Sequence, residues 1–136
     1  MTIEIDHLGI AVRSLAEGLR FYEGALGMEI TGTETIASEQ VAVAMLPAGA
    51  ARIELLEATG EESPIARFIE KRGPGLHHIA LRVDDLPLAI ERLRSEGARV
   101  LNEPQRGAGG HLYVFVHPAS TGGVLLELIQ KERVRD

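Results

Sequence analysis

The chain has 136 residues, of which 45% are hydrophobic and 25% are charged, as in an ordinary soluble globular protein. Its formal net charge of −6 argues against nucleic acid as a main partner, because phosphate contacts require a basic surface. The absence of cysteine excludes disulfides, zinc–thiolate sites and a thiol nucleophile. We find neither a leader-like start nor an apolar run near the ~20 residues that span a bilayer. We therefore expect a cytoplasmic protein with no membrane partner.

The first half of the chain predicts a strand, a helix and three further strands. Ser14 and Glu17 form a capping-box pattern at the start of the helix, which we expect to run to Gly27. Alternating apolar residues and turn signals predict the strands. Their expected ranges are residues 3–12, 28–33, 40–46 and 52–58.

A short linker helix and a second strand–helix–strand–strand–strand series follow. Ser63 and Pro64 predict the start of the linker helix, and Gly73 predicts its end. Asp84 or Asp85 is expected to cap the next helix. The strands of this half are expected at residues 77–83, 98–101, 112–117 and 124–130.

One histidine and one glutamate recur at matching places in the two halves. Aligning His7 with His78 also matches the apolar residues around them, and a later strand of each half matches Glu54 with Glu127. A repeated fold requires repeated apolar residues, but not a repeated imidazole and carboxylate inside apolar strands. Strand alternation places His7 on a face with small neighbours, which leave space beside it. We therefore interpret the repeat as a duplicated site.

Two imidazoles and two carboxylates are a suitable ligand set for a divalent ion such as Zn, Co, Mn, Fe or Ni. Taken singly, each residue has a structural explanation: such a histidine commonly serves packing, and such a glutamate commonly marks the exposed face of an edge strand. Their coincidence under one repeat favours the metal site. Two ligands from each half would also explain why the halves must close on one another.

The other histidines have no matching partner in the first half. His77 points to the face opposite His78, so we expect it to serve packing or to lie at the surface. His111 is unmatched, and His117 precedes Pro118 in an expected turn. The glycine cluster at residues 107–110 predicts a mobile loop, with backbone amides offered to a ligand as the alternative.

In the stretches around the repeated histidines and glutamates, the chain resembles the methylmalonyl-CoA epimerases, a family of the vicinal oxygen chelate (glyoxalase-like) superfamily. The doubled His77-His78 after Gly75-Leu76, and His117-Pro118 leading to Gly-Val-Leu-Leu-Glu-Leu at 123–128, are the most family-specific features. The resemblance covers residues 5–130, and the stretches that carry it are 5–11, 21–22, 38–41, 53–57, 63–66, 75–80, 117–118 and 123–128.

The resemblance implies an α+β fold in which two tandem βαβββ modules form a cupped, half-open eight-stranded mixed sheet around a metal. Residues 1–136 would then be a single domain. Its first repeat would cover about residues 3–58, its linker helix about 63–73 and its second repeat about 76–130.

The resemblance also implies the site. His7, Glu54, His78 and Glu127 would ligate a divalent metal, with Co²⁺ as the active form and Zn²⁺, Mn²⁺ or Ni²⁺ as alternatives. Glu39 and Glu127 would be the catalytic acid and base. They would interconvert (R)- and (S)-methylmalonyl-CoA by abstracting and returning the α-proton through a metal-stabilised enolate. A homodimer is implied as well.

Three further positions bear on this expectation. Glu54 stands where some epimerases have Gln and others Glu. The family usually has Gly after the Glu-Gln pair that contains its catalytic glutamate, whereas Val41 directly follows Gln40 here. Arg106, beside the glycine cluster, is a candidate for holding the CoA phosphates.

Three alternative functions are compatible with the sequence. A glyoxalase I-like lyase uses a similar His/Glu set on a glutathione adduct. A ring-cleaving dioxygenase binds Fe(II) with two His and one carboxylate, and the fourth ligand Glu54 argues against it because O₂ needs open positions. A metal-free drug-binding protein of the same fold would not require all four ligand positions to be filled.

Overall fold

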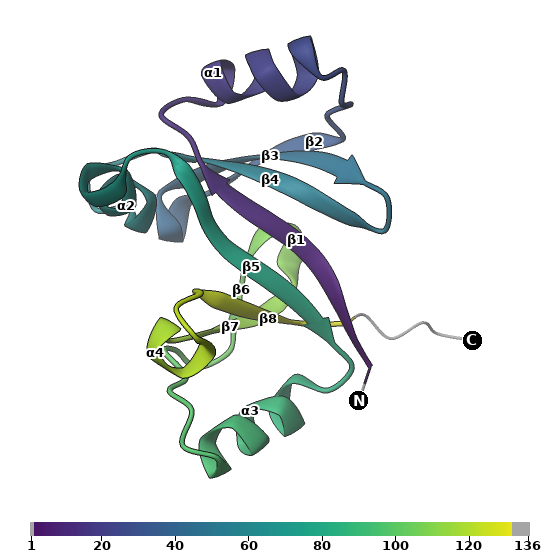
Figure 1. The fold of residues 1–136 in the computed structure, drawn as a ribbon, viewed down its shortest axis with the longest axis vertical. Coiled ribbons are helices and arrows are strands. Elements are labelled where there is room, and N and C mark those ends of the chain that lie inside the picture. The colour runs from purple at the N-terminus through teal and green to yellow at the C-terminus, as the bar shows by residue number, and fades with distance from the viewer. Residues whose placement is uncertain (1, 132–136) are drawn as a thin grey trace. The chain divides into compact units, whose positions relative to one another are not determined.

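The computed structural model describes residues 2–131 and contains eight strands within them (Figure 1). The strands are β1 (Ile3–Ala11), β2 (Gly32–Ile36), β3 (Val41–Ala48), β4 (Ala51–Ala58), β5 (Gly75–Val83), β6 (Gln105–Arg106), β7 (Leu112–Val116) and β8 (Leu126–Gln130). The α-helices are α1 (Leu15–Leu19), α2 (Pro64–Arg72), α3 (Leu86–Ser95) and α4 (Pro118–Thr121). A π-helical turn η1 (Arg20–Ala25) follows α1 directly, and the 3₁₀ turns are η2 (Ala37–Glu39) and η3 (Ala108–Gly110).

These elements fall into two compact units. The first unit is His7–His77, and the second unit joins the described residues up to Asp6 to those from His78 onward. The strand order is β2-β3-β4-β1 in the first unit and β1-β5-β8-β7-β6 in the second, because β1 contributes residues to both. β1 with β4 and β5 with β8 are parallel, whereas β2–β3, β3–β4, β6–β7 and β7–β8 are antiparallel. The prediction of an eight-stranded mixed sheet from two βαβββ modules is confirmed.

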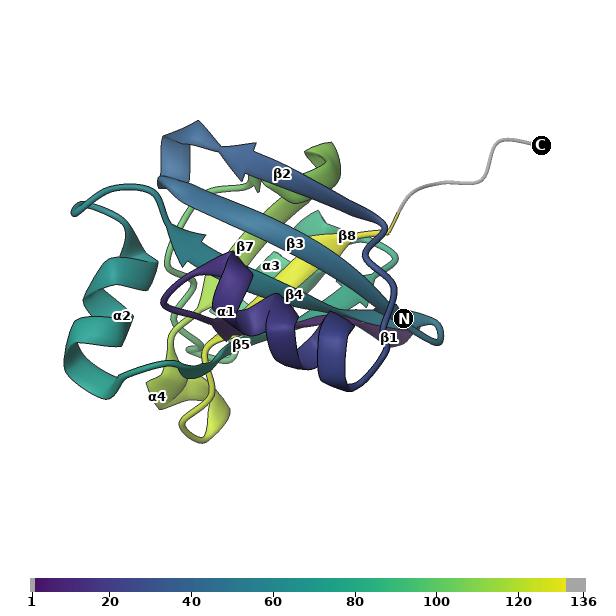
Figure 2. The same cartoon turned by 90° about the horizontal axis from the view of Figure 1, so that it is seen from above.

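The first unit packs a helix on each face of its strands. On one face, Leu15 and Leu19 of α1 pack against a buried cluster of Val12, Ala44, Leu46 and Leu55, and Figure 2 shows α1 lying across β3 and β4. On the other face, residues of α2 pack against a second cluster. Its buried members are Ala11, Val41, Val43, Leu56 and Ile65.

The second unit uses α3 in the same way. Leu86, Ala89 and Ile90 of α3 pack against one face of β5, β7 and β8, and the buried strand residues there are Val83, Val114, Val116 and Leu128. The opposite face carries Ala80, Tyr113 and Ile129. Side chains of a strand alternate between its faces, so His78 and Glu127 lie on this second face, away from α3.

The predicted helix starts are confirmed by their capping hydrogen bonds. Ser14 Oγ accepts from the Glu17 N–H at 3.1 Å, and Ser63 Oγ accepts from the Ile65 N–H at 3.2 Å. Asp85, one of the two expected caps, accepts from the Leu88 N–H at 3.0 Å. Each bond satisfies a backbone donor that the first turn of a helix cannot pair.

One strand prediction is wrong, and the bounds of two others differ from those of the structure. Residues 28–33 were expected to form a strand, but Met28 and Ile30 pack against the α1-side cluster, and β2 begins at Gly32. Residues 98–101 were expected to pair fully, yet Val100 makes only an isolated bridge to Val116, and the two-residue β6 follows at Gln105–Arg106. The last strand begins at residue 126 rather than 124. Within residues 2–131, no helix is both long and apolar enough to cross a membrane.

Candidate metal centre

The first unit holds one buried imidazole–carboxylate pair. His7 on β1 and Glu54 on β4 are each 3% exposed, and His7 Nδ1 lies 3.4 Å from Glu54 Oε2. The two strands run in parallel with Gly9 beside Glu54. Because Gly9 has no side chain, β1 places no Cβ directly beside this carboxylate.

Arg52 holds the same carboxylate oxygen. Its Nη2 lies 2.7 Å from Glu54 Oε2, and its Nε donates to that atom at 2.8 Å. Arg52 is two residues before Glu54 on β4 and therefore shares its face. The buried Glu54 thus has a permanently charged partner, which compensates for part of the cost of burying a carboxylate.

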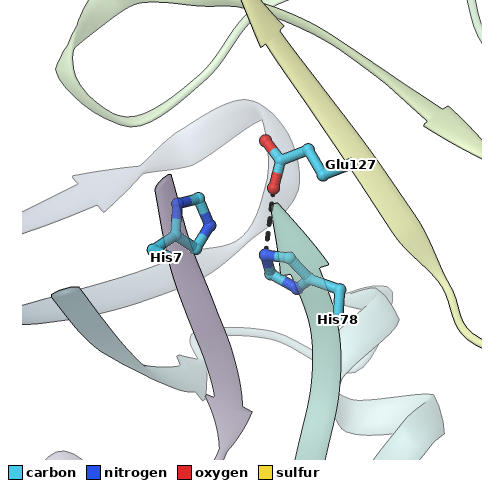
Figure 3. Close-up of side chains that lie close together, drawn as sticks. All are labelled: His7, His78 and Glu127. Atoms are coloured by element: carbon cyan, nitrogen blue, oxygen red, sulfur yellow. Dashed lines mark ion pairs between the residues drawn. The ribbon is translucent and has the colours of Figure 1, made fainter. Parts of the chain in front are cut away.

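The second unit holds the matching pair. His78 on β5 and Glu127 on β8 are 6% and 8% exposed, and His78 Nε2 lies 2.9 Å from Glu127 Oε1, the contact dashed in Figure 3. Phe115 on β7 packs its ring edge-on against His78, with 5.6 Å between ring centroids and 90° between ring planes. The aromatic contact restricts the orientation of the His78 imidazole.

Strand register shows that the two pairs are equivalent. Gly9 is the β1 partner of Glu54, and Ala80 is the β5 partner of Glu127. In both units, therefore, the histidine lies two residues before the residue that stands beside the glutamate. The repeat seen in the sequence is therefore a repeat of strand register.

Each pair has the donor atoms that a divalent transition metal requires. Imidazole nitrogen and carboxylate oxygen suit Zn, Co, Mn, Fe and Ni. A buried carboxylate is costly unless it is paired with a cation or with hydrogen-bond donors, and the sequence places one in each unit. The residues present fit a metal site, and all four predicted ligands are buried.

Glu39, the predicted catalytic residue, lies outside both pairs. It ends η2, is partly exposed, and precedes β3, whose first residue Val41 pairs with Ala58 at the end of β4. Glu54 lies four residues earlier on β4, which corresponds to about 13 Å of strand. The strand register therefore separates Glu39 from the His7–Glu54 pair along the first unit.

His77, His117 and Arg106 serve packing or backbone order. The ring of His77 packs edge-on against Phe68 of α2, with centroids 5.1 Å apart, which confirms the packing role. His117 caps α4, since its Nδ1 accepts from the Ala119 N–H at 2.9 Å. Arg106 Nη1 donates to the Gly110 carbonyl at 2.7 Å and so orders the glycine cluster.

Two charged residues of these strands were missed. The spacing of two residues puts Arg52 on the same strand face as Glu54, but Arg52 has no counterpart in the repeat, so no pattern in the sequence singles it out. Asp6 is only 5% exposed, and Arg82 Nη1 lies 3.3 Å from its Oδ1. Side chains alternate along β1, which places Asp6 on the face opposite His7. Being next to His7 in the sequence therefore gave no reason to expect that Asp6 is buried.

Comparison with known proteins places the chain in a family. Residues 6–115 match the glyoxalase/bleomycin resistance protein/dioxygenase superfamily. The ethylmalonyl-CoA/methylmalonyl-CoA epimerase of Cereibacter sphaeroides is 40% identical over 93% of this chain and 96% of its own. The mitochondrial methylmalonyl-CoA epimerase of Bos taurus is 35% identical over 93% of this chain and 73% of its own.

A solved structure is similar over its whole length. It is a methylmalonyl-CoA epimerase in complex with methylmalonyl-CoA and NH₄⁺, with a TM-score of 0.92, 37% identity and 99% of each chain covered. The expected resemblance to the methylmalonyl-CoA epimerases is confirmed, and the chain belongs to the glyoxalase/bleomycin resistance protein/dioxygenase superfamily.

Proposed function

We propose that the protein is a metal-dependent methylmalonyl-CoA epimerase in which His7, Glu54, His78 and Glu127 ligate one divalent cation, with Co²⁺ as the active form. The observation that carries the proposal is the duplicated buried His–Glu pair at equivalent register positions. Similarity to epimerases over nearly the whole chain supports the substrate. We further propose a cytoplasmic homodimer, as the sequence resemblance implies.

The ligand set suits the chemistry of an α-carbon next to a thioester. A bound divalent cation supplies positive charge that offsets the charge developing on the thioester oxygen as the α-proton leaves. His7 and His78 contribute neutral nitrogen donors, whereas Glu54 and Glu127 supply negative charge. Burial of all four side chains excludes water from them, which strengthens their electrostatic interactions.

Two carboxylates are available to move the proton. In the proposed reaction Glu39 takes the α-proton on one face of the substrate, and Glu127 donates a proton to the opposite face; the roles reverse in the other direction. Each such general acid–base contribution is typically worth about 10²–10⁴-fold in rate. Glu39 is partly exposed, so it remains accessible to a substrate that arrives from solvent.

Deuterium exchange tests the proposal. The protein is incubated with Co²⁺ and methylmalonyl-CoA in D₂O, and the α-proton is followed by NMR. We expect protein-dependent exchange that Glu39→Gln lowers about 10²-fold or more, because the amide cannot accept the proton. The matched control is Glu61→Gln, which neutralises an exposed glutamate of the same unit and should leave the rate unchanged.

The exchange assay, a glutathione-dependent turnover assay and metal analysis together separate the alternatives. Exchange no faster than without protein would refute the epimerase, and an unchanged rate in Glu39→Gln would refute the role of Glu39. Turnover of methylglyoxal with glutathione would instead indicate a lyase. Protein that stays metal-free after cobalt or zinc soaking would indicate a binding protein.

A further inference from the structure

Arg52 places a fixed positive charge beside the carboxylate of Glu54. Both of its contacts to Glu54 end on Oε2, and His7 Nδ1 faces the same oxygen. Among the described residues, Oε1 is thus the Glu54 oxygen left to a cation. Arg52 is 26% exposed at its side chain whereas Glu54 is 3% exposed, so the guanidinium reaches the buried carboxylate from the rim.

The repeat does not supply a second arginine. The position two residues before Glu127 is Leu125, which carries no charge. Glu54 therefore has the guanidinium of Arg52 at hydrogen-bond distance. The equivalent position beside Glu127 holds Leu125, which cannot supply a positive charge.

We propose that Arg52 is a charge-balancing residue, which cancels much of the negative charge of Glu54 and so weakens the hold of this ligand on a divalent cation. The inference rests on the proposed function, in which Glu54 is a metal ligand. Arginine stays protonated at any relevant pH, so the balance is permanent. A ligand set with less negative charge leaves a bound cation more able to attract electron density from a substrate oxygen.

A purely orienting role for Arg52 predicts the opposite sign. Removing a partner that only orients a metal ligand lowers metal affinity about 10–100-fold. Removing a positive charge that competes for the ligand should instead raise the affinity, because the cation no longer shares the carboxylate with a guanidinium. The sign of the change in affinity therefore separates the two roles.

The test is calorimetric titration of metal-free full-length protein with CoCl₂. We expect Arg52→Gln, which keeps a hydrogen-bond donor but no charge, to bind Co²⁺ about tenfold more tightly than wild type. Arg52→Lys keeps the charge but loses the planar guanidinium with its several N–H donors, and its Co²⁺ affinity should stay within about twofold of that of wild type. In the R52Q/E54Q double variant both charges are gone, and the gain in affinity should disappear.

Further variants keep the result decisive. Arg52→Met retains an apolar stem without charge and must change affinity in the same direction as Arg52→Gln. Arg67→Gln removes an arginine from an exposed pair with Glu62 and should have no effect. The proposal would be overturned if the neutral variants bound Co²⁺ no more tightly than wild type. It would also be overturned if Arg52→Lys bound Co²⁺ as tightly as Arg52→Gln.

The titration also distinguishes the two proposals. Wild-type protein that binds no cobalt would refute the metal site itself. Wild-type protein that binds cobalt, combined with neutral Arg52 variants that bind no more tightly, would refute only the role of Arg52. The absorption spectrum of bound Co²⁺ gives an independent readout, because it reports on the ligands around the ion.

Discussion

Gln40 adopts a left-handed backbone directly after Glu39. Its φ and ψ are 50° and 52°, and among the described residues it is the one non-glycine with positive φ. The Gln40 carbonyl accepts from the Thr59 N–H at 2.8 Å, and a Cβ at Gly60 would overlap the Gln40 side chain. Gln40 thus adopts a conformation that favours glycine, next to the place where the family usually has one. These contacts fix the end of η2, and with it the backbone of Glu39.

Substitution at Gln40 should show this constraint. Gln40→Val introduces a β-branched side chain at positive φ, and we expect a loss of about 1–2 kcal/mol in the free energy of unfolding. Asn tolerates the left-handed region, so Gln40→Asn is the matched control and should cost less than about 0.5 kcal/mol. Urea denaturation measures both variants. Equal stability of the two would show that the turn is free to adopt another conformation.

At the level of single residues, the sequence predicts those site residues that occur once in each half of the repeat. His7, Glu54, His78 and Glu127 were found because each has a counterpart, and all four are buried. Arg52 was missed because its counterpart position is apolar, and its role depends on a side-chain contact that composition and periodicity do not encode. A singular residue beside a duplicated one is visible only once strand register and side-chain distances are known.

Two serine caps with different surroundings give a prediction at the level of helices. Ser63 is fully buried and accepts from the Ile65 N–H, whereas Ser14 is partly exposed and accepts from the exposed Glu17 N–H. Ser63→Ala should cost about 1–3 kcal/mol, because the donor at Ile65 would be left buried without an acceptor. Ser14→Ala should cost about 0.5 kcal/mol, because water can replace the hydroxyl.

Thermal unfolding of the two variants measures the difference. A cost for Ser14→Ala equal to that for Ser63→Ala would mean that burial does not set the value of a cap in this protein. Circular dichroism at low temperature serves as the control, since both variants should keep the helix content of the wild type.

Helix ends were predicted better than strands because caps are local. A capping serine or aspartate acts within three residues, so sequence spacing contains the whole interaction. A strand requires a neighbour, and Met28 and Ile30 alternate as in a strand but pack as apolar anchors beside α1. Residues 98–101 fail for the same reason, because only Val100 finds a bridging partner. Pairing is decided by distant residues, which local alternation cannot reveal.

Across the whole chain, the duplication of a βαβββ module carries the proposed function. In each module one face packs against α1 or α3, and the opposite face, which in the first unit also packs against α2, presents one histidine and one glutamate. Period-two alternation accounts for both properties at once, since the same strands supply the core and the ligands. If one cation binds both His–Glu pairs, as we propose, metal binding should stabilise the folded state of the whole chain.

Metal binding should stabilise the protein with a stoichiometry of one ion per chain. At a free Co²⁺ concentration of 100 times Kd, binding to the folded state alone contributes about 2.7 kcal/mol, which thermal unfolding would detect as a higher Tm. His7→Ala and His78→Ala should each abolish most of this gain, although they lie in different units. His117→Asn is the matched control: it removes a histidine, keeps a side chain able to cap α4, and should leave the cobalt effect intact. Elemental analysis that finds two ions per chain, or a single-histidine variant that keeps the full gain, would show that each pair binds metal independently.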